Sequence, residues 1–133
     1  MSRGSGYVGT LPGVTSAADL SGYTGRFAKM ATATTVTYAA AATDAIVGII
    51  ADGGIDSGDP VSIDTRVGVI VELEVDGAAG EISVGSMLTS DSAGRGIATT
   101  ADGNIIGAMA LEASTTQGDV IRVRTMADHL YIA

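Results

Sequence analysis

The most regular pattern in the chain is an alternation of apolar and polar positions between Arg66 and Asp76. Successive side chains of a β-strand point to opposite faces of its sheet, so this alternation predicts a strand with one buried and one solvated face. Glu72 and Glu74 fall on the solvated face. The buried face is predicted to carry Val67, Val69, Val71, Leu73 and Val75.

A second alternating stretch lies near the end of the sequence. Residues 105–111 form an apolar run, a small polar loop follows, and residues 119–124 then place Arg122 and Arg124 between apolar neighbours. This order predicts a strand, a loop and a second strand. Residues 46–63 have the same arrangement, so the two stretches resemble copies of one unit. Their matching positions are Val47-Gly48 with Ile106-Gly107, Gly58-Asp59 with Gly118-Asp119, and Val61 and Ile63 with Ile121 and Val123.

Shorter apolar or β-branched stretches, separated by glycine-containing turns, predict the remaining strands. Residues 22–30 and 33–38 form a predicted hairpin, and Ala101–Asn104 a hairpin turn after a strand at 97–100. Residues 126–133 form a tail that ends in a predicted edge strand at Leu130-Tyr131-Ile132. The total is about nine or ten short strands at roughly 8–12-residue spacing, which favours a sandwich or barrel over a βαβ fold. The predicted fold class is therefore all-β.

Composition refines this picture to one small domain preceded by an arm. The chain has 133 residues, lacks Trp and has Phe27 as its only Phe, so its core must be built from small aliphatic side chains. Residues 1–18 are Gly-rich and aperiodic, which predicts an extended N-terminal arm before a β domain at residues 19–133. The arm could be a disordered terminus or a segment that orders against a partner. In the second case its candidate contacts are Tyr7, Val8, Leu11 and Pro12.

The charge and the missing residue types exclude several function classes. The formal charge of −8 makes the surface acidic, and such a surface repels phosphate backbones, so we expect no nucleic-acid partner. No apolar run approaches the ~20 residues that span a bilayer, and no secretory signal opens the sequence, so we expect no membrane association and synthesis in a cytoplasm. Because Cys is absent, the chain forms no disulfide, thiolate zinc site or thiol nucleophile.

Few residues suggest catalysis or metal binding. Glu72 and Glu74 share a strand face, as the carboxylates of a glycosidase could, but no aromatic sugar platform accompanies them. Asp52, Asp56 and Asp59 could offer oxygens to Ca²⁺, yet their spacing misses the EF-hand pattern and suits ordinary turns. The sequence also lacks a phosphate-binding loop and a nucleophile-elbow motif. We therefore expect a protein without enzymatic activity, cofactor or metal.

Four charged residues suggest an ion-pairing pattern instead. Glu72 and Glu74 on one predicted strand match Arg122 and Arg124 on another in spacing and have the opposite charge. Opposite charges that face each other across strands contribute roughly 0.2–1 kcal/mol per pair. We expect these residues to form charge pairs, either between strands of one sheet or between subunits.

Two motifs in the second half of the sequence resemble those of the capsid cement, or decoration, proteins of tailed bacteriophages. The run IIGAMALEASTTQGDVIRV at residues 105–123 resembles the closing segment of that family, and ISVGSMLTSDSAGRGIA at residues 82–98 resembles an internal passage. Residues 19–30 and 44–51 resemble its first two strands, so the resemblance covers about residues 19–125. The matching positions of the internal passage are Gly85, Leu88, Thr89, Ser90, Asp91, Gly94 and Arg95.

The resemblance implies a small β-barrel or β-tulip-like domain, usually a homotrimer, on the outer surface of an icosahedral phage head. A protein of this kind binds the major capsid protein and stabilises its shell without catalysis. The arm residues Tyr7, Val8, Leu11 and Pro12 then become candidate capsid contacts. The alternative is an all-β adhesion or carbohydrate-binding module, which would need an exposed aromatic platform.

Overall fold

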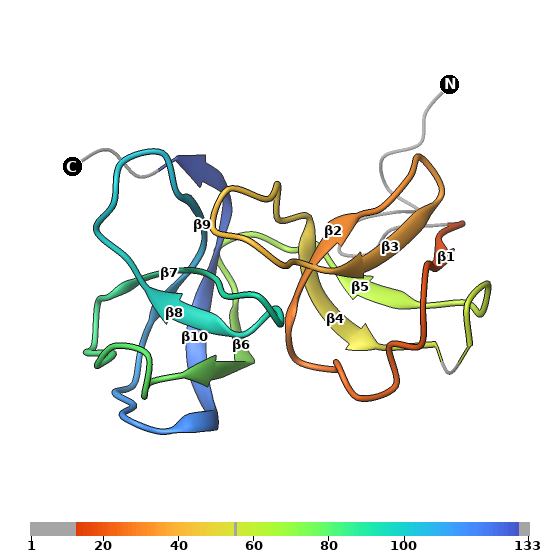
Figure 1. Ribbon diagram of the computed structural model, residues 1–133. Helices are drawn as coiled ribbons and strands as arrows, with labels where there is room; N and C mark the ends of the chain where they lie inside the picture. The colour runs from red at the N-terminus through yellow and green to blue at the C-terminus, as the bar shows by residue number, and fades with distance from the viewer. Residues whose placement is uncertain (1–12, 55, 131–133) are drawn as a thin grey trace.

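The structure is a computed structural model that describes residues 13–54 and 56–130, the last four of these by backbone alone. Within these ranges the regular structure consists of ten strands and no helix. The strands form two sheets that lie side by side: an open sheet from the N-terminal half of the chain and a closed barrel from the C-terminal half (Figure 1). The prediction of an all-β fold with a small barrel is confirmed.

The open sheet takes its five strands from the first half of the chain. They are β1 (Thr15–Ser16), β2 (Phe27–Met30), β3 (Thr35–Tyr38), β4 (Gly48–Asp52) and β5 (Ser62–Asp64), in the spatial order β1-β3-β2-β4-β5. β2 and β3 form the predicted hairpin. An isolated bridge between Thr15 and Pro60 brings β1 close to the chain just before β5. Pro60 has no N–H group with which to extend this pairing, so the sheet stays open.

The barrel takes its five strands from the second half. They are β6 (Ile70–Asp76), β7 (Met87–Ser90), β8 (Gly96–Ala98), β9 (Ile105–Ala110) and β10 (Gln117–Leu130), and the closed order is β10-β6-β8-β7-β9. β6 and β8 pair in parallel, while the other neighbours are antiparallel. Closure leaves no unpaired edge in the ring, which removes the groups that would otherwise pair with another chain.

The predicted repeat corresponds to one antiparallel strand pair in each sheet, β4 with β5 and β9 with β10. Its matching glycines both allow a close approach. A Cβ atom on Gly48 would overlap the carbonyl oxygen of Asp64, and one on Gly107 would lie 2.6 Å from the ring of Phe27. The shared glycine therefore marks a crowded position in each strand pair, where no side chain fits.

The sequence-based prediction for strand β6 is wrong in part. β6 starts at Ile70 instead of Arg66, because Gly68 has a φ of +78° and turns the chain, which leaves Val67 58% exposed. Further along, the predicted faces are correct, since Leu73 and Val75 are fully buried.

The turn at Ala101–Asn104 exists but does not connect a hairpin. Asn104 donates its backbone N–H to the Ala101 carbonyl at 3.3 Å. The strands on either side, β8 and β9, are nevertheless separated by β7, which pairs with both. A turn sequence reverses the chain locally, whereas the choice of neighbouring strand depends on the whole barrel.

Leu130, the first residue of the predicted last edge strand, belongs to β10. Leu130 of β10 lies opposite Ile105 of β9, so the long strand keeps its place in the barrel to the end of the described chain. Residues 131–133 lie outside the described residues, as does the predicted arm up to residue 12 with Tyr7, Val8, Leu11 and Pro12. At the end of the predicted arm, Ser16 is buried in β1 and its backbone N–H donates to the Asp59 carbonyl at 2.8 Å.

Two clusters of buried side chains fill the molecule. The open-sheet cluster uses residues of the first half alone: Leu20, Ala28, Val36, Ile50, Val61 and Ile63. The barrel cluster combines both halves, with Leu73, Val75, Ile82, Leu88, Ala108, Ala110, Ile121 and Val123 from the second and Phe27, Ala39, Ile46 and Ile49 from the first. The open sheet therefore completes the core of the barrel.

Candidate functional site

The two sheets meet where the start of β2 runs against β6 and the turn between β7 and β8. The backbone N–H of Phe27 donates to the Gly94 carbonyl at 2.8 Å, and the N–H of Glu74 donates to the Gly25 carbonyl at 2.8 Å. Gly94 has a φ of +83°, a conformation that favours glycine. These bonds join the sheets at the backbone level, so the junction is part of the fold and not a loose contact.

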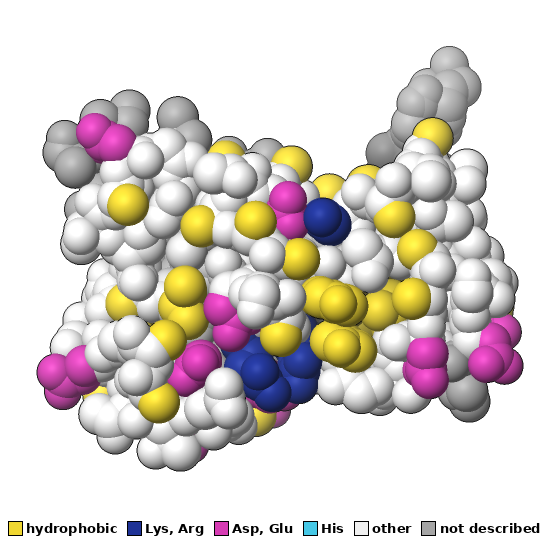
Figure 2. Space-filling view, viewed as in Figure 1, with side chains coloured by type: hydrophobic (Ala, Val, Ile, Leu, Met, Phe, Trp, Pro, Cys, Tyr) yellow, Lys and Arg dark blue, Asp and Glu magenta, His cyan; other side chains and the backbone are white. Residues whose placement is uncertain are grey.

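A three-residue ionic cluster spans this junction. Glu74 of β6 accepts a hydrogen bond from Arg95 Nε at 2.7 Å and bonds from Arg26 Nε at 3.3 Å and Arg26 Nη2 at 3.2 Å. All three side chains are mostly buried, at 11–21% exposure. Arg26 precedes β2 and Arg95 precedes β8, so one carboxylate links the two sheets and the barrel turn. Figure 2 shows basic side chains gathered between the two lobes, with acidic and hydrophobic ones around them.

The electrostatics of this cluster are those of a structural ion pair. Burial raises the pKa of the Glu74 carboxyl, but the hydrogen bonds and charges of Arg95 and Arg26 outweigh burial and leave the pKa below its ordinary value of 4.5. A glycosidase acid needs a raised pKa so that it holds a proton near neutral pH. Glu74 is therefore suited to holding two arginines and not to general-acid catalysis.

The internal motif that resembles cement proteins forms the barrel side of this junction. Asp91 shapes its turn, since its carboxylate accepts the backbone N–H groups of Ala93 at 2.8 Å and Arg95 at 2.9 Å. The buried hydroxyls of Thr89 and Ser90 donate to carbonyls of the segment after β3, at 3.1 Å to Ala42 and 3.2 Å to Ala39. The polar residues of the motif thus shape the turn and reach across to the open sheet.

The described aromatic side chains pack near the junction of the two sheets. The rings of Tyr23 and Tyr38 stack with centroids 4.3 Å apart and an interplanar angle of 6°, and the guanidinium of Arg26 lies 4.7 Å from the Tyr23 ring centroid. Phe27 is fully buried. Tyr23 and Tyr38 are half-buried, and their rings stack on each other.

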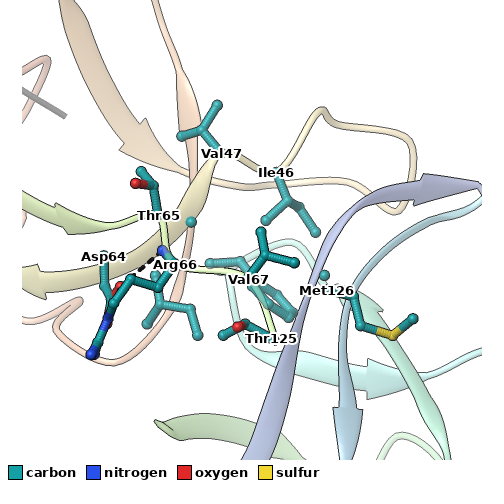
Figure 3. A pocket seen from close by; sticks show the side chains of 12 residues that line it. Ile46, Val47, Asp64, Thr65, Arg66, Val67, Thr125 and Met126 are labelled. Atoms are coloured by element: carbon teal, nitrogen blue, oxygen red, sulfur yellow. Dashed lines mark hydrogen bonds and ion pairs between the residues drawn. The ribbon is translucent and has the colours of Figure 1, made fainter. Parts of the chain in front are cut away.

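Two shallow grooves run between the sheets. One, of about 380 Å³, is lined by residues that include Ile46, Val67 and Met126 around the Asp64–Arg66 ion pair (Figure 3). The other, of about 320 Å³, lies beside Glu72, Glu74 and Val120. Their walls share Ile49 and Asp64, so they are neighbouring parts of one cleft.

The residues predicted to form charge pairs lie on two neighbouring strands, Glu72 and Glu74 on β6 and Arg122 and Arg124 on β10. β6 and β10 pair in antiparallel register, with Arg122 opposite Glu72, Val120 opposite Glu74 and Arg124 opposite Ile70. The ion pairs of the described residues nevertheless go elsewhere. Glu74 binds Arg26 and Arg95, and Arg122 Nε lies 3.4 Å from Glu112 in the loop after β9. Within one chain, Glu74 and Arg122 therefore form their ion pairs with residues outside β6 and β10.

Arg26 and Arg95 are the residues that sequence reasoning missed. Both belong to stretches that resemble cement proteins, but spacing within a stretch gives no indication that they converge on one carboxylate 48 and 21 positions away. Of the Asp residues considered for Ca²⁺, Asp52 ends β4, while Asp56 and Asp59 share a turn in which the backbone N–H of Asp56 donates to the Asp59 carboxylate at 2.9 Å. No group of three or more acidic, His or Cys side chains in the described part of the chain is arranged to hold a metal ion.

Comparison with known protein families identifies a relationship for most of the chain. The model of a family described as phage cement protein matches residues 21–125, which span β2 to most of β10. Neither the curated proteins nor the solved structures include a significant match. The described chain has no helix long and apolar enough to cross a membrane. Because the matched region covers both sheets and their junction, the chain belongs to the phage cement protein family.

Proposed function

We propose that the protein is a capsid cement protein that binds the outer surface of an icosahedral phage head and stabilises the shell of major capsid protein. The observation that carries this proposal is the family match over residues 21–125. The protein is synthesised in the host cytoplasm, assembles as a homotrimer and acts in the virion without catalysis.

The physical properties of the fold support this role. The closed barrel has no free sheet edge, and the open sheet is fastened to it by backbone bonds and the Glu74 cluster. Segments with many paired backbone groups and buried contacts resist local opening, which suits a protein that holds shell subunits together. Three linked copies also convert weak individual contacts into tight overall binding, because the second and third contacts form at high effective concentration.

The first experiment tests attachment to the head. Purified protein is mixed with expanded heads and with compact procapsids of the phage that encodes it, and bound protein is quantified after sedimentation. We expect saturable binding to expanded heads, weaker binding to procapsids and greater resistance of decorated heads to heat. No binding to either particle contradicts the cement role, and equal binding to both contradicts selectivity for the expanded shell.

The second experiment tests the N-terminal arm. We propose that Tyr7, Val8, Leu11 and Pro12 contact the shell, since bulky residues spaced along a Gly-rich segment can each fill a separate pocket. Deletion of residues 1–12 retains β1 with its buried Ser16, so the domain should remain folded. Binding to heads is expected to weaken at least about tenfold. Unchanged binding by the folded deletion variant would exclude the arm as a contact.

A further inference from the structure

The β6–β10 face, defined here as Ile70, Glu72, Val120, Arg122 and Arg124, carries charges of both signs, and two of them, Glu72 and Arg124, form no ion pair within the described residues. These side chains point outward from the barrel, and all five are exposed. Glu72 and Arg124 occupy diagonal positions, because Glu72 is opposite Arg122 and Arg124 is opposite Ile70.

The same side of the molecule also exposes apolar side chains. Four large hydrophobic residues of the described chain are exposed, and three of them, Val67, Ile70 and Val120, lie on β6, β10 or the turn before β6. Their exposed fractions are 58%, 60% and 58%. Val67 and Val120 line the cleft between the sheets, so the apolar residues continue from the face into a hollow. Clustered apolar exposure of this kind marks a contact surface.

We propose that the β6–β10 face is covered by a second copy of this chain, with Glu72 of one copy against Arg124 of the next. This inference rests on the proposed self-association and names its surface. A face that carries both charges beside exposed apolar residues can meet a neighbouring copy of the same chain, because each charge finds its opposite there. Around a threefold axis, the Glu72 side of each copy meets the Arg124 side of its neighbour, so every copy satisfies both charges.

Charge complementarity is the reason for choosing a second copy over the capsid shell. A partner with one predominant charge would satisfy Glu72 or Arg124 and repel the other. Exposed ion pairs alone contribute little, so burial of Ile70 and Val120 must supply most of the affinity, and the charges select the partner and the register.

The first test replaces an apolar side chain at the cleft end of the proposed contact. Val120→Asp is compared with the matched control Val84→Asp, because Val84 is also exposed, at 69%, but lies in the turn before β7. Mass in solution is measured by sedimentation velocity over a range of concentrations without capsids. We expect wild type and Val84→Asp to be oligomers and the dissociation constant of Val120→Asp to rise at least about tenfold. A monomeric wild type, or equal association by all three proteins, overturns the inference.

The second test is a charge exchange, which does not rely on the fold of a single variant. Glu72→Arg and Arg124→Glu should each weaken association, and the double variant, which keeps both charges with their places exchanged, should regain it. Thermal unfolding of each variant shows that the fold is retained. Single variants that associate like wild type, or a double variant no better than either, overturn the inference.

Binding to expanded heads separates this inference from the cement role. Monomeric Val120→Asp should still bind heads, but more weakly, because its three contacts are no longer linked. A Val120→Asp variant that stays oligomeric and loses head binding assigns the face to the shell and overturns the inference, while the cement role stands. Failure of wild type to bind heads, with the solution oligomer intact, contradicts the cement role and leaves the assigned contact in place.

Discussion

The two sheets have the same number of strands but complete their structures in different ways. The barrel closes through a continuous ring of pairings, whereas the open sheet has β1 at one edge and β5 at the other, with the isolated Thr15–Pro60 bridge between them. The two hydrophobic cores also differ in whether they depend on the other half of the chain. The open-sheet cluster uses no barrel residue, while the barrel cluster takes four residues from the first half of the chain.

This comparison shows that a closed ring of strands is not a self-sufficient domain here. Phe27, the largest fully buried side chain, comes from β2 and packs among barrel residues at the glycine of β9. A small core made mostly of Val, Ile and Ala has little other volume with which to fill that space. The barrel therefore depends on the open sheet for packing, and the open sheet depends on the barrel for support along β2.

The largest effect is expected for Phe27→Ala. Truncation of a fully buried Phe leaves a cavity and costs about 3–5 kcal/mol of unfolding free energy. Amide hydrogen exchange should show loss of protection in both β2 and β9, because the ring packs against both sheets. The matched variant Leu20→Ala, in the open-sheet cluster, should loosen the first half alone. If Phe27→Ala leaves β9 protected, the cores are independent.

A smaller effect is expected for Gly107→Ala. The new Cβ atom would lie 2.6 Å from Phe27 Cε1 and 3.0 Å from Ile46 Cδ1, so the sheets must separate or the ring must move. Overpacking of this kind costs about 1–3 kcal/mol. The control Gly80→Ala, where an added Cβ meets nothing within 4 Å, should change the free energy of unfolding by no more than about 0.5 kcal/mol. Equal urea midpoints for the two variants would show that the junction is loosely packed.

The ionic link should contribute a similar or smaller amount. Glu74→Gln weakens hydrogen bonds to Arg26 and Arg95 but keeps the shape of the side chain, and a lost charged hydrogen bond costs about 1–3 kcal/mol. We expect a lower urea midpoint and lower amide protection around Gly25 and Gly94. A variant as stable as wild type would mean that packing alone joins the sheets.

The smallest effect is expected in how the stability difference between wild type and Glu74→Gln depends on pH. Folding lowers the pKa of Glu74, so its stabilisation is complete above the ordinary value of 4.5 and is lost as the pH falls through the lower folded-state pKa. The stability difference between wild type and Glu74→Gln should therefore be largest near neutral pH and shrink below about pH 4.5. Urea titrations at several pH values measure it, and a difference that does not change with pH contradicts the assignment.

Much of the local structure could be predicted from single residues. The alternation of Leu73, Val75, Ile121 and Val123 with their neighbours correctly identified the buried faces of β6 and β10. Gly118, predicted to end a loop, has a φ of +89° and lies at a register shift near the start of β10. The error at Val67 arose because alternation continues through Gly68, where the backbone turns. The junction was not predictable, since Arg26 and Arg95 are ordinary charged residues until the fold brings them to Glu74.

The amino-acid sequence alone was enough to predict most of the strands, the buried side of the long barrel strands, and the family of the chain. Those properties follow from the two-residue period of a strand, from the conformational freedom of glycine, and from motif residues close together in the chain. Only the tertiary structure decided that β7 separates β8 from β9, that Phe27 completes the other sheet's core and that Glu74 binds two distant arginines. The physical reason is that strand neighbours and ion partners are chosen by competition among all parts of the chain, which no local pattern records.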